Sequence, residues 1–320
     1  MRLLADAELQ PAAVQLLPLG DDPARLEALL AGPEMAELAT HFPCVIDAAD
    51  AARLSPAQLA AAHAAGCRLL AAGAILVAET APADLPASGA QYLALAGDPP
   101  PAAKAGTAKT GSRALALRLA QLVAADADTR EIEEVFRLEP TLAYHLLRLV
   151  NSPGVGVGRQ ITSFAQAILI LGRKQLRRWL NLLLFSAKDD PRAPMLLARA
   201  TLRARSIELL AKEAGLDREA QESAFMVGMF SLLGVMFGMP LAQVLAPLKL
   251  DPELVAALLR REGELGAYLA AVEAAEQGDA AALQAAATLL PATLDFDLLR
   301  LEACRWMLSL LQAGAERSDE

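Results

Sequence analysis

The chain has 320 residues, of which 55% are hydrophobic but only 4% aromatic, and its formal net charge is −9. A chain of this length exceeds what one compact core usually needs, so we expect two domains. The net negative charge argues against a dedicated nucleic-acid binder. Residues 1–105 carry 5 basic and 12 acidic side chains, so most of the negative charge lies in the first third.

The three cysteines, Cys44, Cys67 and Cys304, are widely spaced and form no CxxC pair. This usage predicts buried thiols in a reducing compartment. The first ten residues, MRLLADAELQ, contain an early Asp and Glu and no apolar run of signal-peptide length. We therefore expect no secretory signal and a cytoplasmic protein.

Residues 1–98 contain short β-capable runs that alternate with helical segments. The runs lie at 43–47, 67–71 and 74–79. Between the first two, Ser55 and Pro56 predict a helix start and Gly66 predicts its end. This alternation indicates a small α/β module over residues 1–98. The Pro, Ala, Gly and Thr residues that follow predict a linker at 99–111.

From residue 112 onward the pattern is helical, and no segment reads convincingly as a strand. A domain of ten or more helices is therefore expected over residues 112–320, which makes the fold class α/β plus all-α. The predicted helices cover 112–125, 129–138, 140–150, 163–172, 173–187, 194–214 and 224–240, with further helices starting near 251, 263, 279 and 295. A glycine-rich loop is predicted at 151–162.

The segment 224–240, AFMVGMFSLLGVMFGMP, lies within a stretch that has no charged residue between Glu222 and Lys249. Because it is apolar on every face, it predicts a helix buried in the core of the larger domain. Pro240 ends the apolar segment after about fifteen residues, whereas a membrane span needs about twenty.

Histidine does not form a metal motif in this chain. His41, His63 and His145 are the only three, and none is followed by Asp or belongs to an HExxH pattern. We interpret His145 as a polar helical residue in preference to a metal ligand. The tripeptide Glu27-Ala28-Leu29 spells EAL inside a helical context, and we interpret that match as accidental.

Four basic residues and a tryptophan form a cluster at Arg173, Lys174, Arg177, Arg178 and Trp179. Such a cluster could hold a phosphate or a nucleotide. We favour a solvated basic face as the simpler interpretation.

Asn151 and Ser152 follow a predicted helix, close to Arg148 near its end. Both side chains can bond the last helical carbonyl groups and orient the glycine-rich loop. We favour this structural role over direct ligand binding.

Two stretches carry a resemblance to a known family. LEPTLAYHLLRLVNSPG followed by ITSFAQAILILGRKQLRRWLNLL, within residues 138–183, resembles the HDOD domain, a helical relative of the HD phosphohydrolases found in bacterial signalling proteins. The resemblance extends over about residues 112–290 and is similar to the domain as it occurs in EAL–HDOD proteins. There an EAL-type barrel precedes the helices, which implies that residues 1–98 are a shortened, degenerate EAL-like module. Residues 74–80 and 91–97 look like its last strands, and a module of this length cannot close a (β/α)8 barrel.

The resemblance also implies which chemistry has been lost. Catalytic HD domains carry a His–Asp pair in G-[LMF]-x-H-D-x-G, and here Ser231 and Leu232 occupy those two positions. The preceding helix, with Arg199, Arg203 and Arg205, offers no His as a further ligand. The resemblance therefore implies no catalytic residue, no metal and no cofactor.

Together these observations predict a non-catalytic signal-transduction protein that acts through protein–protein contacts. The predicted contact surface consists of Arg148, Asn151, Ser152, Arg173, Arg177, Arg178 and Trp179. The alternative is a sensor that binds a nucleotide such as cyclic-di-GMP without hydrolysing it. A metal-dependent phosphodiesterase is a third interpretation, and nucleic acid is the weakest candidate partner.

Overall fold

The fold is described from a computed structural model. It describes residues 1–17, 23–78, 85, 88–96, 119, 121–132, 164–183, 192–246, 250–288, 290 and 294–315. Contacts between Cα atoms divide the chain into two units. Unit 1 combines Met1–Pro101, Pro194–Leu241 and Asp251–Glu320, and unit 2 combines Ala102–Ala193 and Ala242–Leu250. Each unit is described separately below.

Unit 1 contains a six-stranded sheet. Its strands are β1 (Arg2–Ala5), β2 (Pro11–Gln15), β3 (Cys44–Ile46), β4 (Arg68–Leu69), β5 (Ile75–Ala78) and β6 (Tyr92–Leu95). The strand order is β4-β3-β2-β1-β6-β5, so β4 and β5 are the two edges. β1 runs antiparallel to both of its neighbours, whereas β2, β3 and β4 are parallel to one another and β5 is parallel to β6. A small apolar core on this sheet includes Leu4, Val45 and Ala94.

The predicted strands at 43–47, 67–71, 74–79 and 91–97 are confirmed as β3, β4, β5 and β6. The hairpin formed by β1 and β2 was not predicted. Its turn is held by Asp6, whose side chain accepts hydrogen bonds from the backbone N–H groups of Glu8 and Gln10, and Leu9 adopts a φ of 60° there.

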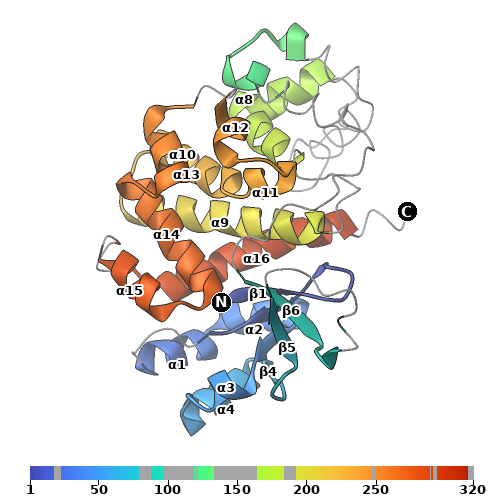
Figure 1. Ribbon diagram of the computed structural model, residues 1–320, viewed down its shortest axis with the longest axis vertical. Helices are drawn as coiled ribbons and strands as arrows, with labels where there is room; N and C mark the ends of the chain where they lie inside the picture. The colour runs from blue at the N-terminus through green and yellow to red at the C-terminus, as the bar shows by residue number, and fades with distance from the viewer. Residues whose placement is uncertain are drawn as a thin grey trace. The chain divides into compact units, whose positions relative to one another are not determined.

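Four helices accompany these strands (Figure 1), namely α1 (Pro23–Ala31), α2 (Pro33–His41), α3 (Ala48–Ala51) and α4 (Pro56–Ala64). The predicted start of α4 is confirmed, because Ser55 and Gln58 form a reciprocal capping box. Gly66 follows the helix at a φ of 89°, a conformation that glycine adopts without steric cost.

The remaining helices of unit 1 form its second part. They are α9 (Ala193–Glu213), α10 (Arg218–Phe230), α11 (Leu233–Phe237), α13 (Pro252–Arg260), α14 (Gly263–Gln277), α15 (Ala280–Ala287) and α16 (Phe296–Ala315). The starts predicted near Asp251, Asp279 and Asp295 are confirmed, since each carboxylate accepts a hydrogen bond from a backbone N–H group of the helix that follows. α14 packs against β1 and α16 against α2, as Figure 1 also shows.

The prediction of one continuous helix over 224–240 is wrong. α10 begins earlier, capped by Asp217, and ends at Phe230, and α11 begins only at Leu233. Ser231 and Leu232 form the break between them. Burial is confirmed for the middle of the segment, including Phe225 and Leu232, but Met239 at its end is 44% exposed.

Unit 2 contains α8 (Phe164–Leu183) and most of α12 (Leu241–Leu245), together with short helical segments at 121–124 and 129–132. The predicted helix end at Gly172 is confirmed as a kink, because this residue has a φ of 67° and a ψ of 159° inside α8. The predicted helix at 140–150 and the loop at 151–162 lie outside the described residues.

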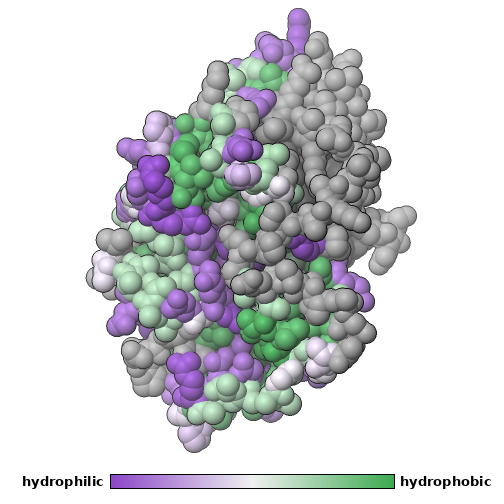
Figure 2. Space-filling model, viewed as in Figure 1, coloured by the Kyte–Doolittle hydropathy of each residue, from purple (hydrophilic) through white to green (hydrophobic). Residues whose placement is uncertain are grey.

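The two contact-based units differ from the predicted domains, which were residues 1–98 and residues 112–320. The units group residues by contacts and do not test where the domains begin and end, so that division stays a prediction. By contacts, the N-terminal α/β part shares unit 1 with α9, α10 and α13–α16. Among the described residues, no helix is both long and apolar enough to cross a membrane. Leu69 in β4 and Val77 in β5 are more than half exposed, and Figure 2 shows apolar surface over the region of the strands.

Candidate functional site

The most heavily charged buried region of unit 1 starts on α9. Arg199 and Arg203 lie one helical turn apart on the same face, and they are 5% and 0% exposed. α10 approaches α9 closely at this level. A Cβ on Gly228 would lie 2.4 Å from the Cα of Ala204, so only glycine fits there.

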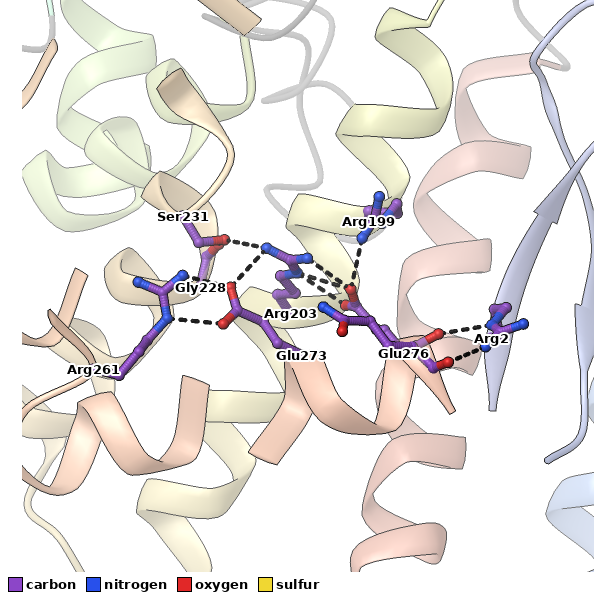
Figure 3. A network of polar contacts seen from close by, with 9 residues as sticks. Arg2, Arg199, Arg203, Gly228, Ser231, Arg261, Glu273 and Glu276 are labelled. Carbon is purple, nitrogen blue, oxygen red and sulfur yellow. Dashed lines mark hydrogen bonds and ion pairs between the residues drawn. The ribbon is translucent and has the colours of Figure 1, made fainter. Parts of the chain in front are cut away.

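Both arginines bind one carboxylate on α14 (Figure 3). The Nη2 of Arg199 lies 3.1 Å from Oε2 of Glu276, while Nε and Nη2 of Arg203 lie 3.0 Å and 2.9 Å from the same oxygen. Nε of Arg203 also donates to Oε1 of Glu276 at 3.1 Å. Glu276 is 6% exposed, so this is a buried ion pair with a guanidinium fork.

A second carboxylate lies one turn earlier on α14. Glu273 accepts hydrogen bonds from Nη1 of Arg203 at 3.2 Å and from Nε and Nη2 of Arg261, both at 2.8 Å. Arg261 ends α13 in the left-handed conformation, with a φ of 57°. Arg203 therefore lies between two glutamates, each of which has a second arginine partner.

Ser231 joins this region to the break between α10 and α11. Its Oγ accepts a hydrogen bond from Nη1 of Arg203 at 3.2 Å and donates one to the backbone oxygen of Gly228 at 2.7 Å. The next residue, Leu232, is fully buried. The two positions that correspond by resemblance to the His–Asp pair thus hold a hydroxyl bonded to a guanidinium and an apolar side chain.

The first strand contacts the same helix. Arg2 donates from Nε to the backbone oxygen of Glu276 at 2.8 Å and from Nη2 to the backbone oxygen of Gln277, the last residue of α14. We call the set of side chains described so far the arginine–glutamate network, whose members are Arg2, Arg199, Arg203, Ser231, Arg261, Glu273 and Glu276.

The electrostatics favour ionised glutamate in this network. Burial by itself would raise the pKa of Glu276, but Arg203 and Arg199 outweigh it and hold the pKa below the usual value. A guanidinium does not deprotonate in a protein, so it cannot serve as a general base. Among the described residues, no cluster of three His, Cys, Asp or Glu side chains could hold a metal ion.

A smaller polar cluster lies where the parallel strands β2 and β3 end. Nε2 of Gln15 donates to Asp47 at 3.1 Å and to Asp50 at 3.0 Å. Burial, and then the charge of Asp47, raise the pKa of Asp50. Gln15 is 2% exposed, and within the described part of the chain its Oε1 has no hydrogen-bond partner.

The predicted basic cluster lies in α8, and two of its arginines have contacts within unit 2. Arg173 pairs with Asp126 at 3.0 Å and donates to the backbone oxygen of Ala127, while Arg177 donates to the backbone oxygen of Val123 at 3.1 Å. These arginines bind the end of a preceding helical segment, as cations near helix C-termini often do. Lys174 is exposed.

The other predicted contact residues are not placed. Arg148, Asn151 and Ser152 lie outside the described residues, and so does His145. Arg178 and Trp179 belong to α8, but their side chains are not among those described. His41 and His63 are exposed in α2 and α4. Glu27 is exposed in the helix α1, which confirms the helical context predicted for the EAL tripeptide.

Sequence reasoning missed the network apart from Ser231. One signal was available, because Arg199 and Arg203 recur at helical spacing among small and apolar residues, where a buried charge requires a partner. The partners Glu273 and Glu276 lie about seventy residues away, and no local pattern connects them to α9.

Comparisons with known proteins agree with the resemblance in the helical part. Residues 113–246 match the family model described as "HDOD domain". Over 154 residues the chain is 30% identical to "Cyclic di-GMP phosphodiesterase CdgJ" of Vibrio cholerae, a match covering 48% of this chain and 35% of that protein. Over 153 residues it is 27% identical to "Uncharacterized protein YuxH" of Bacillus subtilis, covering 47% and 37%. The chain thus spans about a third of the length of these curated relatives, and no solved structure matches it.

Proposed function

We propose that this chain, which contains an HDOD domain over residues 113–246, is a non-catalytic regulatory protein of bacterial signalling that acts through protein–protein contacts. In this proposal it works in the cytoplasm, without a metal or cofactor. Its N-terminal α/β part is a degenerate EAL-type module that keeps a structural role.

One observation carries the proposal, namely what occupies the positions of the lost His–Asp pair. Ser231 is bonded to Arg203, whose guanidinium also binds Glu273 and Glu276. A cation is thus already present beside these carboxylates, and it is part of the chain. A metal ion would have to displace a guanidinium and compete with its permanent charge, which works against a metal-dependent mechanism.

In this proposal the EAL-type module lacks a closed barrel, and the order of the described strands agrees with that. A (β/α)8 barrel needs eight strands that close on one another. The six strands described here have the order β4-β3-β2-β1-β6-β5, in which the edge strands β4 and β5 are not hydrogen-bonded to each other. At the carboxyl ends of β2 and β3, the side-chain amide of Gln15 donates hydrogen bonds to both Asp47 and Asp50.

Metal content and turnover test the proposal directly. The full chain, purified without chelators and then loaded with Mn²⁺, Fe²⁺ or Zn²⁺, should retain less than stoichiometric metal by elemental analysis after gel filtration. It should also release no product from cyclic-di-GMP. One bound metal per chain together with turnover would overturn the proposal in favour of a phosphodiesterase.

The second candidate is a cyclic-di-GMP sensor that binds without hydrolysis. It is favoured by the similarity to the Vibrio cholerae relative, whose name links that protein to cyclic-di-GMP. It is weakened by the basic cluster, because the contacts of Arg173 and Arg177 to residues 123–127 occupy part of their donor capacity. Titration calorimetry with cyclic-di-GMP distinguishes the two: saturable heat without hydrolysis supports the sensor, and no heat at high ligand concentration removes it.

The surface for protein contacts stays a prediction in this proposal. It comprises Arg148, Asn151, Ser152, Arg173, Arg177, Arg178 and Trp179. Affinity capture with the full chain, compared with an Arg177→Glu, Arg178→Glu variant, tests it. An Arg53→Glu variant is the control, since Arg53 is an exposed arginine near α3 in unit 1.

A further inference from the structure

The arginine–glutamate network contains one residue that is held through both its main chain and its side chain. The backbone oxygen of Glu276 accepts a hydrogen bond from Arg2 of β1 at 2.8 Å. The carboxylate of the same residue binds Arg199 and Arg203 of α9. With Glu276 only 6% exposed and held on both sides, a displacement of its main chain cannot be absorbed by free rotation of the side chain.

Arg2 binds the C-terminal end of α14. Gln277, whose backbone oxygen also accepts from Arg2, is the last helical residue, and Gly278 follows in the left-handed conformation with a φ of 75°. The terminal carbonyl groups of a helix lack intrahelical donors, so an arginine from β1 is a strong partner for them. The position of the first strand and the end of α14 are thereby linked.

The other end of the network lies at the break between α10 and α11. Arg203 donates from one nitrogen, Nη1, to both Ser231 and Glu273, each at 3.2 Å. Ser231 ends α10, and Leu232 has a φ of −101° and a ψ of 1°, in the sparsely populated bridge region. Because the hydroxyl of Ser231 is bonded to Arg203, the network reaches the boundary between these two helices.

We infer that the arginine–glutamate network couples the N-terminal sheet to the break between α10 and α11. A displacement of β1, such as binding at the sheet would produce, loosens the hold on Glu276, then on Arg203, and finally on Ser231. Every step is a direct contact between described residues: Arg2 binds the main chain of Glu276, and the later steps join side chains. The inference assigns to the break the second arrangement that such coupling requires. The inference rests on the proposed regulatory function, because it gives that function a mechanism of transmission.

Hydrogen exchange measured by mass spectrometry on the full chain tests this coupling. Arg2→Ala should raise the exchange rate of peptides covering residues 227–237 by about threefold or more, a ratio typical of coupling between sites. Arg25→Ala is the matched control. Arg25 also reaches from the N-terminal part to a C-terminal helix, where it donates to the backbone oxygen of Leu294 at 2.6 Å and to Asp295 at 3.1 Å, but it does not belong to the network.

The control variant should leave exchange in residues 227–237 at the wild-type rate. Equal exchange in the two variants, or no rise in Arg2→Ala, would overturn the inference. If Arg2→Ala lacks a cooperative melt, Arg2→Lys and Arg25→Lys replace the pair, because lysine keeps the charge but cannot bridge two carbonyl groups with a rigid fork. The rise is then smaller but still confined to the Arg2 variant.

The result is independent of the test of the proposed function. Bound metal with turnover would remove the non-catalytic role and leave the exchange data unaffected. Equal exchange in the two variants would remove the coupling and leave the non-catalytic role in place.

Discussion

Glu276 is the residue whose loss should cost the most in the described core. It balances the guanidinium groups of Arg199 and Arg203, which are both almost fully buried. Removing one partner of a buried ion pair leaves the other charge without compensation, which is far more costly than the net value of the pair.

We therefore expect Glu276→Gln to lower the free energy of unfolding by about 3–5 kcal/mol, measured by urea denaturation. Glu262→Gln is the matched control, because Glu262 also binds an arginine, Arg260 at 2.7 Å, but both side chains are more than half exposed. That control should leave the free energy of unfolding unchanged within error. A similar loss of unfolding free energy in the two variants would contradict the expectation that burial makes the Glu276 ion pairs costly to break.

The same residue predicts a pH dependence. Because its pKa in the folded chain lies below the ordinary value of about 4.3, ionised Glu276 stabilises the fold above that value. The stabilisation is lost as the pH falls from about 4.3 through the folded pKa. The difference in unfolding free energy between the wild type and Glu276→Gln should therefore be constant near neutral pH and shrink below about pH 4. A difference that grows on acidification would contradict this assignment.

Restoring the residues of a catalytic HD pair should not restore a metal site. Ser231→His together with Leu232→Asp places an imidazole beside Arg203 and a carboxylate where a fully buried leucine stood. We expect a loss of about 3 kcal/mol or more in stability and no bound metal by elemental analysis. A Ser231→Ala, Leu232→Ala variant removes the same side chains without adding polar groups. The difference in stability between the two variants therefore measures the cost of burying the imidazole and the carboxylate. Metal binding at an unchanged melting temperature would reveal a dormant site.

At the scale of elements, local sequence signals predicted where helices begin and end, but they did not predict where a long apolar segment breaks into two helices. Ser55, Pro56 and Gly66 predicted α4 because capping and glycine termination act within a few residues. The break at Ser231 was missed because its neighbours are apolar on both sides and its partner, Arg203, is a residue of another helix. The β1–β2 hairpin was missed because β1 has only four residues, too few for a clear strand pattern.

The candidate site was also predictable only where its signal is local in the sequence. Sequence comparison by resemblance located Ser231 and Leu232, because the surrounding glycines Gly228 and Gly234 fixed the register of the motif. It could not locate Glu276 or Arg2, since ion pairs between remote segments depend on tertiary packing and leave no spacing to detect.

The kink in α8 provides a test of backbone conformation alone. Gly172 has a φ of 67° and a ψ of 159°, a region open essentially only to glycine, and a Cβ there would meet no atom within 4 Å. Gly238 has a φ of 62° and a ψ of 31°, the left-handed helical region that asparagine tolerates. We expect Gly172→Asn to cost about 1–3 kcal/mol and Gly238→Asn clearly less, measured by chemical denaturation. Equal costs would contradict the difference in backbone strain.

At the scale of the whole molecule, the N-terminal α/β part behaves as an integral part of unit 1. Arg2 binds α14, Arg25 binds the residues that begin α16, and Arg305 of α16 binds Glu37 of α2. Unit 1 also includes residues from both sides of the end of the family match at 246. A chain cut at residue 112 would therefore expose helix surfaces that the α/β part covers.

We expect residues 112–320 alone to melt at least roughly 10 °C below the full chain, because each lost kcal/mol lowers the melting temperature of a domain of this size by about 2–4 °C. The control is the full chain cleaved at a protease site introduced within residues 102–111, which keeps both pieces. Its fragments should co-elute in gel filtration and melt close to the intact chain. A truncated chain that melts like the intact one would show that the helices form an autonomous domain.

The contact between Arg2 and Glu276 also constrains the order in which the chain can fold during synthesis. Its partners are 274 residues apart, and the contacts of Arg25 with Asp295 and of Arg305 with Glu37 span 270 and 268 residues. The first strands leave the ribosome long before α14 and α16 exist, so their packing surface stays uncovered until those two helices have been synthesised. At about 5–20 residues per second this interval lasts on the order of 15–60 seconds. Chaperone binding to the nascent N-terminal part should therefore be prolonged, and it should end only after residue 305 has been synthesised.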